Sequence, residues 1–344
     1  ADQVHQLLGP GALSTSADHD SSESLGPIDR GELEERLPHP AAKDAGVIVQ
    51  IQQWLGRAQQ PDYGTIKSYS ERATIDVHPA LLDALADASL ALGVDGLEGF
   101  VSRGERRLGL RAYEASPPFL VVGGDHLDDS SEFALGEREL RFAVGAEVAH
   151  LRFGYTRLTS SELWDGVLYR GKQALDVAAM LAGPLGALGN LLRGAQQVSS
   201  VERVLRQVGQ VSRKAAGVFG VAKEIQQVWG PERDAEPGQP DELGGADPAQ
   251  LLAACRAMQL GADRAGLVLA GDLGAALRAV FLSSRGYAPE LRMAQRHGLT
   301  KSLSRQDAEG ALPQPELSLR LASLCAFYLS EDYAALRRAM MRDR

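Results

Sequence analysis

The chain has 344 residues, of which 44% are hydrophobic and 24% are charged, a composition typical of ordinary globular proteins. Its formal net charge of −9 excludes nucleic acid as a main partner, because binding to phosphates requires a basic surface. The two cysteines, Cys255 and Cys325, form neither a disulfide framework nor a metal-binding spacing, so a cytoplasmic location is expected.

The first 45 residues are predicted to be a polar linker from a longer protein. Serine and acidic residues crowd positions 14–24, and four prolines interrupt the segment. Little apolar surface is therefore available to offset the entropy of ordering. Residues 46–344 are then expected to form one domain, with ordered structure beginning at 47–55.

The first half of this domain is predicted to combine helices with a small sheet. Apolar residues recur at helical spacing over 79–92, and His78-Pro79 is the signal for the start of this helix. The run from Phe142 to Leu151 indicates a second, buried helix. Between the two helices lie three short β-like runs, at 99–101, 108–113 and 119–123, separated by turn residues.

A helical insert is predicted at 174–229, followed by an acidic, Pro/Gly-rich loop at 230–248. Residues 177–192 carry no charge, but this run is shorter than the roughly 20 residues that cross a bilayer. Residues 201–229 repeat apolar residues at spacings of three and four, which indicates a long amphipathic helix. That seam could pack on its own domain or mediate self-association, and peripheral membrane association through 177–229 stays open.

Two further helical regions are expected near the C-terminus. Small residues line one face of 251–270, which predicts close packing against the helix that contains Phe142 to Leu151. Residues 317–341 are apolar at helical spacing and end in arginines. Cations in a last helical turn suit the helix dipole and do not indicate a nucleic-acid site.

Candidate functional residues lie in the Phe142–Leu151 run, where Glu147 and His150 interrupt an apolar sequence. Burying two ionisable groups is costly unless other groups pair with them. The pattern is one substitution away from H-E-x-x-H, in which two His side chains hold Zn²⁺ and the Glu acts as general base. Ala146 stands at the first His position.

These elements, in this order, resemble the HtpX/CAAX-prenyl-protease type of zinc metallopeptidase, a gluzincin. In that family a small sheet precedes the H-E-x-x-H helix, and a hydrophobic helical insert follows. A second helix carries E-x-x-A-D, whose Glu is the third zinc ligand, and a later H-P segment with an Arg lines the substrate site. The resemblance covers roughly residues 65–330. It implies an α+β, mostly α, gluzincin-like domain with a small β-sheet and a long helical insert.

The chain departs from the family pattern at three positions. Ala146 replaces the first ligand His, Gln259 the ligand Glu, and Gln314 the later His. The residues of the pattern that remain are Glu147, His150, Asp263 and Arg320. Under this alignment two of the three protein ligands to zinc are lost, and His150 alone is a weak site. Without zinc, the pKa of the attacking water stays near about 15.7 instead of falling to about 7.

The resemblance therefore implies a catalytically inactive pseudopeptidase without a cofactor, serving as a scaffold or as a regulatory module that binds a protein or peptide. The substrate cleft that the resemblance implies could hold an extended peptide beside the sheet by strand addition, which needs no zinc. An alternative is an active Zn²⁺-dependent endopeptidase with non-standard ligands. A second alternative is a peripheral membrane-associated module.

The remaining polar residues also have purely structural interpretations. Glu147 and His150 could pair with each other or with Arg264, and Asp263 could form a local cap or salt bridge. A relocated metal site would need other ligands, although no spacing in the sequence directs them towards Glu147. The candidates are His78, His126, His297, Asp125, Asp128 and Asp129.

Overall fold

The computed structural model describes residues 25–43, 63–102, 108–155, 248–304 and 314–341, together with Gly9 and Leu13. The predicted insert at 174–229, with its seam at 201–229, lies outside these ranges, as do the predicted start of order at 47–55 and nearly all of the loop at 230–248. The described chain is mostly helical with one small sheet, which confirms the predicted α+β, mostly α class. None of its helices combines the length and the hydropathy that crossing a bilayer requires.

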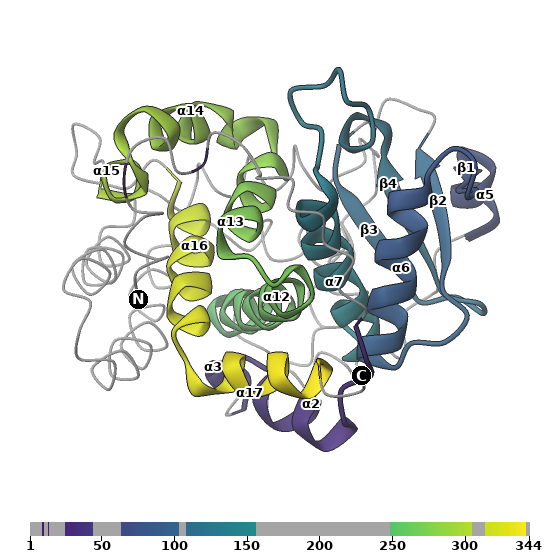
Figure 1. The fold of residues 1–344 in the computed structure, drawn as a ribbon, viewed down its shortest axis with the longest axis horizontal. Coiled ribbons are helices and arrows are strands. Elements are labelled where there is room, and N and C mark those ends of the chain that lie inside the picture. The colour runs from purple at the N-terminus through teal and green to yellow at the C-terminus, as the bar shows by residue number, and fades with distance from the viewer. Residues whose placement is uncertain are drawn as a thin grey trace.

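The sheet has four strands in the order β1-β2-β4-β3 (Figure 1). The central strands β2 and β4 run parallel, whereas the edge strands β1 and β3 pair antiparallel with them. The strands are β1 (Ser70–Arg72), β2 (Glu98–Ser102), β3 (Leu110–Tyr113) and β4 (Phe119–Gly123). The three predicted runs are confirmed. Strand β1 escapes prediction because Ser-Glu-Arg has no apolar alternation.

Two helices, α6 (Pro79–Leu92) and α7 (Glu137–Arg152), pack against each other beside this sheet (Figure 1). Helix α6 contacts β2, and α7 contacts the edge strand β3. Helix α6 has the bounds that the sequence predicts, beginning at Pro79 because proline suits the first helical turn. The contact with β3 places the middle of α7 next to an edge strand of the sheet.

Helix α7 also packs along α12 (Pro248–Ala270), which runs through the centre of the molecule (Figure 1). The contact depends on glycines. A Cβ added to Gly266 would lie 2.4 Å from the carbonyl oxygen of Phe142, and one added to Gly145 would lie 3.2 Å from Gly266 Cα. The predicted approach of the small-residue face to the Glu147/His150 helix is confirmed.

The C-terminal part of the chain contributes a group of helices that surround α12, of which α13 also contacts α7 (Figure 1). The predicted helical region 317–341 forms two helices, α16 and α17, with a break where the Ser330 hydroxyl accepts the Tyr333 N–H at 3.2 Å. The helices are α13 (Leu273–Leu282), α14 (Ala288–His297), α15 (Leu299–Ser304), α16 (Pro315–Tyr328) and α17 (Glu331–Met340). Short helices are α5 (Tyr63–Ser68), η1 (Gly124–His126) and η5 (Arg285–Tyr287).

Residues 25–43 are ordered, in contrast to the linker expected over 1–45. They form α2 (Arg30–Arg36) and α3 (Pro40–Lys43), which lie beside α17 and α12 (Figure 1). Leu33 and Leu37 are 2% and 0% exposed, at the i, i+4 spacing that presents one face of a helix. The segment is polar on average, so its composition alone does not predict that these two leucines are buried.

Candidate functional site

The residues that the sequence compares with the metallopeptidase pattern come together on α7, α12 and α16. Helix α7 carries Glu147 and His150, α12 carries Gln259 and Asp263, and α16 carries Arg320. Asp263 and Arg320 both influence the ionisation of Glu147 and His150, as expected of neighbours in one cluster. We call these five residues the polar cluster.

The centre of the polar cluster is an ion pair between Asp263 and Arg320. Arg320 donates from Nε and Nη2 to the two carboxylate oxygens, each at 2.8 Å. Gln259 Nε2 donates to Asp263 Oδ1 at 3.0 Å, one helical turn away. Burial opposes the charge on Arg320, but the Asp263 carboxylate outweighs it, so the pKa of Arg320 is raised. Asp263 therefore forms the salt bridge that was one of its two predicted structural roles, although the partner is not local but 57 residues away in the sequence.

Glu147 reaches from α7 to the edge of the sheet. Its Oε2 accepts the backbone N–H of Ala112 in β3 at 3.0 Å. Desolvation is the largest influence and raises the pKa of Glu147 to about 7, although the Ala112 N–H and the cations Arg111 and Arg320 favour the ionised form. A carboxyl with a pKa near neutrality can exchange a proton at physiological pH.

His150 is 3% exposed, and neither of its ring nitrogens has a hydrogen-bond partner among the described residues. The ring of Tyr155 meets it edge-on, with 6.3 Å between the ring centroids. Burial lowers the pKa of His150 to about 4, while Asp263 and Gln259 act in the opposite direction. The imidazole is consequently neutral at pH 7.

The predicted pairing of Glu147 and His150 with each other or with Arg264 is wrong. Arg264 turns to the N-terminal segment, where it donates to the carbonyl oxygens of Pro38 at 3.0 Å and Arg36 at 3.5 Å. Its guanidinium also lies 4.4 Å from the Phe327 ring centroid. Arg264 therefore caps the C-terminal carbonyls of α2 and takes no part in the polar cluster.

The side chains at the motif positions do not fit zinc. Zinc needs three or four donors from His, Cys or carboxylate side chains. Ala146 is 6% exposed and offers only a methyl group, and the Gln259 amide nitrogen is engaged with Asp263. The third position, Gln314, lies just before α16 at its N-cap. His150 is thus left as a single donor.

The other predicted ligands do not assemble a replacement site. His126 accepts the Gly109 N–H at Nε2 and meets the Phe133 carbonyl oxygen through Nδ1, so both nitrogens are used. His78 precedes α6 and His297 ends α14. Asp128 accepts from the N–H and hydroxyl of Ser130, and Asp129 lies next to it in the chain. In the described ranges no group of three His, Cys, Asp or Glu side chains could hold a metal.

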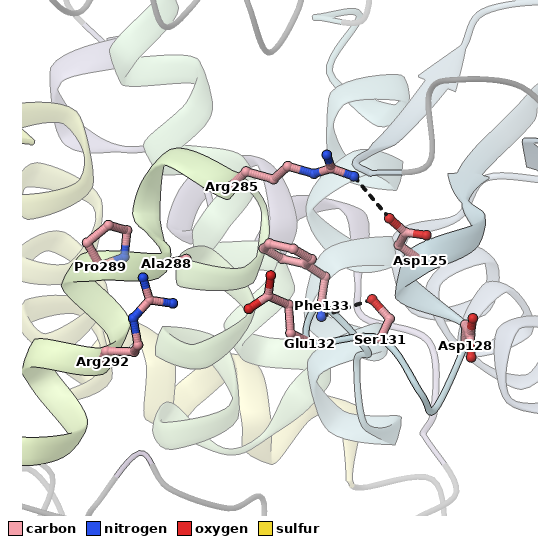
Figure 2. Close-up of a pocket in the computed structure, with 9 residues that line it drawn as sticks. All are labelled: Asp125, Asp128, Ser131, Glu132, Phe133, Arg285, Ala288, Pro289 and Arg292. Carbon is pink, nitrogen blue, oxygen red and sulfur yellow. Dashed lines mark hydrogen bonds and ion pairs between the residues drawn. The ribbon is translucent and has the colours of Figure 1, made fainter.

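A groove of about 560 Å³ lies elsewhere, between the loop that precedes α7 and the start of α14 (Figure 2). Arg285 bridges its walls by pairing with Asp125 at 3.3 Å and stands 5.9 Å from the Phe133 ring. The groove is lined by Asp125, Asp128, Ser131, Glu132, Phe133, Arg285, Ala288, Pro289 and Arg292. It contains no member of the polar cluster, and sequence reasoning did not identify it as a unit.

Comparisons with protein-family models, with curated proteins and with solved structures found no match to this chain. The geometry of the polar cluster is therefore the evidence on which a function has to be argued. Sequence reasoning named all five members of the cluster. It missed the Ala112 N–H, because a backbone donor at a strand edge has no signature in the amino-acid sequence.

Proposed function

We propose that this chain is a catalytically inactive, gluzincin-like metallopeptidase domain that acts as a scaffold or regulatory module by binding a protein or peptide. The observation that carries the proposal is the composition of the polar cluster. A base-like Glu147 and a neutral His150 stand beside an Asp263–Arg320 ion pair, in positions that the metallopeptidase pattern would give to a metal centre. The methyl and amide at the other two positions provide no metal ligand.

The edge of β3 is the proposed place for a bound peptide. The Gly123 N–H donates to the carbonyl oxygen of Gly109, the residue just before β3, at 2.8 Å. From there, every second residue of β3 directs its backbone N–H and C=O groups towards β4. Ala112 points its N–H the other way, towards Glu147. An added strand would use this outward row of backbone groups, and such pairing requires no metal. Glu147 already accepts the Ala112 N–H, which is one of the donor groups that the added strand would need.

Labelled, unfolded casein tests binding and cleavage with one probe. We expect the wild-type chain to bind casein without cleaving it, whether or not a chelator is present. Glu147→Ala releases the Ala112 N–H, so it should tighten binding by about fivefold, the equivalent of one hydrogen bond of roughly 1 kcal/mol. Glu132→Ala is the matched control, because it removes the same charge from an exposed loop and should leave binding unchanged.

The outcomes separate the candidate functions. Casein cleavage that a chelator stops would favour the active zinc endopeptidase. Equal binding by wild type and Glu147→Ala would place the peptide away from β3, and absence of binding in both would overturn the binding module.

A further inference from the structure

The groove between the loop that precedes α7 and the start of α14 has walls of opposite charge (Figure 2). The loop wall carries Asp125, Asp128 and Glu132, and the other wall carries Arg285 and Arg292. Asp125 and Arg285 lie 3.3 Å apart and neutralise each other, which leaves a negative loop wall opposite Arg292 of α14. We call this site the charged groove.

Glu132 and Arg292 are the two charges that a ligand in the charged groove would meet on opposite sides. Both residues are exposed, and neither forms a hydrogen bond or an ion pair with another described residue. In Figure 2 the Glu132 carboxylate points across the groove towards α14, the helix that carries Arg292. A ligand that contacts both must therefore present a cation to the loop and an anion to the helix, which is the charge pattern of a zwitterion.

The α14 wall suits a carboxylate. Side chains on a helix lean towards its N-terminus, and Figure 2 shows the Arg292 guanidinium extending towards Ala288 and Pro289 in the first turn. The N-terminus of a helix carries partial positive charge, which adds to the charge of the guanidinium. Glu290, the acidic residue of this turn, is buried against Ser302 and does not line the groove. An anion is therefore favoured here, and a guanidinium can hold a carboxylate through two parallel hydrogen bonds.

The size of the charged groove favours a short peptide over a single amino acid. Its volume of about 560 Å³ falls in the range of roughly 300–1,000 Å³ that is typical of small-ligand sites. Three extended residues span about 10 Å, so a tripeptide holds its ammonium and carboxylate groups well apart, as opposite walls require. Phe133, Ala288 and Pro289 offer apolar contacts to the part of the ligand between its two charges.

We propose that the charged groove binds short peptides with free termini, of about two to four residues, with the ammonium group at Glu132 and the carboxylate at Arg292. This goes beyond the proposed function, because the β3 edge would bind the interior of a chain, whereas the groove would bind both ends of a small one. The charged groove contains no member of the polar cluster, so the proposal holds whether or not that cluster is catalytically inactive.

Isothermal titration of the full chain with tri-alanine tests the proposal, with N-acetyl-tri-alanine and tri-alanine amide as probes that each lack one terminal charge. We expect tri-alanine to bind at least about fivefold more tightly than either blocked peptide. Arg292→Ala should remove the preference over the amide, and Glu132→Ala should remove the preference over the acetylated peptide. Arg296→Ala of α14 and Asp129→Ala of the loop are the matched controls. Both residues are exposed and lie outside the groove lining, so these variants should keep both preferences.

Other results would overturn the proposal. Equal binding of the three peptides, or no binding of any, would show that the groove does not recognise chain termini. Free alanine that binds as tightly as tri-alanine would show that a peptide is the wrong ligand class. Equal losses in the control variants and in the groove variants would place the ligand elsewhere. Tri-alanine should not displace casein, so this proposal and the proposed function can fail independently.

Discussion

Arg320 of α16 binds both carboxylate oxygens of Asp263 in α12, at 2.8 Å each, where Asp263 is 1% exposed. Desolvating two charges costs several kcal/mol for each ion, and only good geometry with further hydrogen bonds compensates for it. The bidentate contact and the Gln259 amide supply that compensation. The pair joins two helices inside the polar cluster.

Asp263→Ala should destabilise the fold by about 3 kcal/mol, because it leaves the largely buried Arg320 guanidinium without its counter-ion. The free energy of unfolding from urea titration gives the measurement. Arg30→Ala is the control, since it breaks the exposed pair between Arg30 and Glu34 and should cause no measurable change. Equal effects of the two substitutions would show that the buried pair is not structural.

Gly266→Ala should destabilise the contact between α7 and α12 by about 1–3 kcal/mol, because its Cβ would lie 2.4 Å from the Phe142 carbonyl oxygen. Gly261→Ala on the same helix is the control. Its Cβ would lie 3.4 Å from its nearest neighbour, His39 N, and alanine favours a helix. Thermal unfolding should therefore show a large loss for the first variant and little change for the second. The reverse order would contradict the close packing of these helices.

Stability should depend on pH in opposite directions for Glu147, which is partly buried, and His150, which is buried. The pKa of Glu147 is raised from 4.5 to about 7 in the folded state, so the folded chain holds a proton that the unfolded chain has released. Stability from this group falls as pH rises through that range. The pKa of His150 is lowered from 6.5 to about 4, so the unfolded chain binds the extra proton. Stability from this group falls as pH drops below about 6.5.

Urea titrations at pH 5 and pH 8 separate the two contributions. Relative to wild type, Glu147→Gln should gain more free energy of unfolding at pH 8 than at pH 5, because it removes a buried charge present only at the higher pH. His150→Gln should do relatively better at pH 5, because it removes the group that the unfolded state protonates. Differences that do not change with pH would mean that neither group is desolvated as described.

Much of the fold follows from local pattern. The three predicted strands and α6 form as expected, and the small-residue face of α12 meets α7. Sequence patterns do not predict the structure where a few apolar residues lie in a polar segment, or where the interacting residues are far apart in the chain. The apolar pair Leu33 and Leu37 disappears in a polar average, and no spacing in the sequence reveals that Asp263 pairs with a residue 57 positions later.

The sequence predicted which residues belong to the candidate site, but not which groups those residues contact. The motif comparison selects Glu147 and His150, yet their partners depend on the path of the whole chain. Glu147 binds a backbone N–H of β3, and Arg264 is drawn away to the C-terminal end of α2. A backbone donor, or a residue that caps a distant helix, cannot be recognised from the neighbouring amino acids in the sequence.

Placing His and Glu at the two positions that the alignment compares with zinc ligands tests the arrangement of α7 and α12. In the variant Ala146→His with Gln259→Glu, positions 146 and 150 share one face of α7, and residue 259 lies next to His150. We expect this double variant to bind one zinc ion per chain, with a rise in melting temperature when zinc is added. Adding His150→Ala should abolish both effects. Failure of the double variant to bind zinc would argue against a metal-site ancestry for the polar cluster.

The most direct test of the proposed inactivity is the zinc content of the wild-type chain after chelation and dialysis against trace zinc, measured by plasma mass spectrometry. The three aligned ligand positions leave one donor, His150, and the described residues contain no group of three that could hold a metal, so we expect far less than one zinc ion per chain. One zinc ion per chain in wild type, lost in His150→Ala, would contradict the account and restore the endopeptidase interpretation.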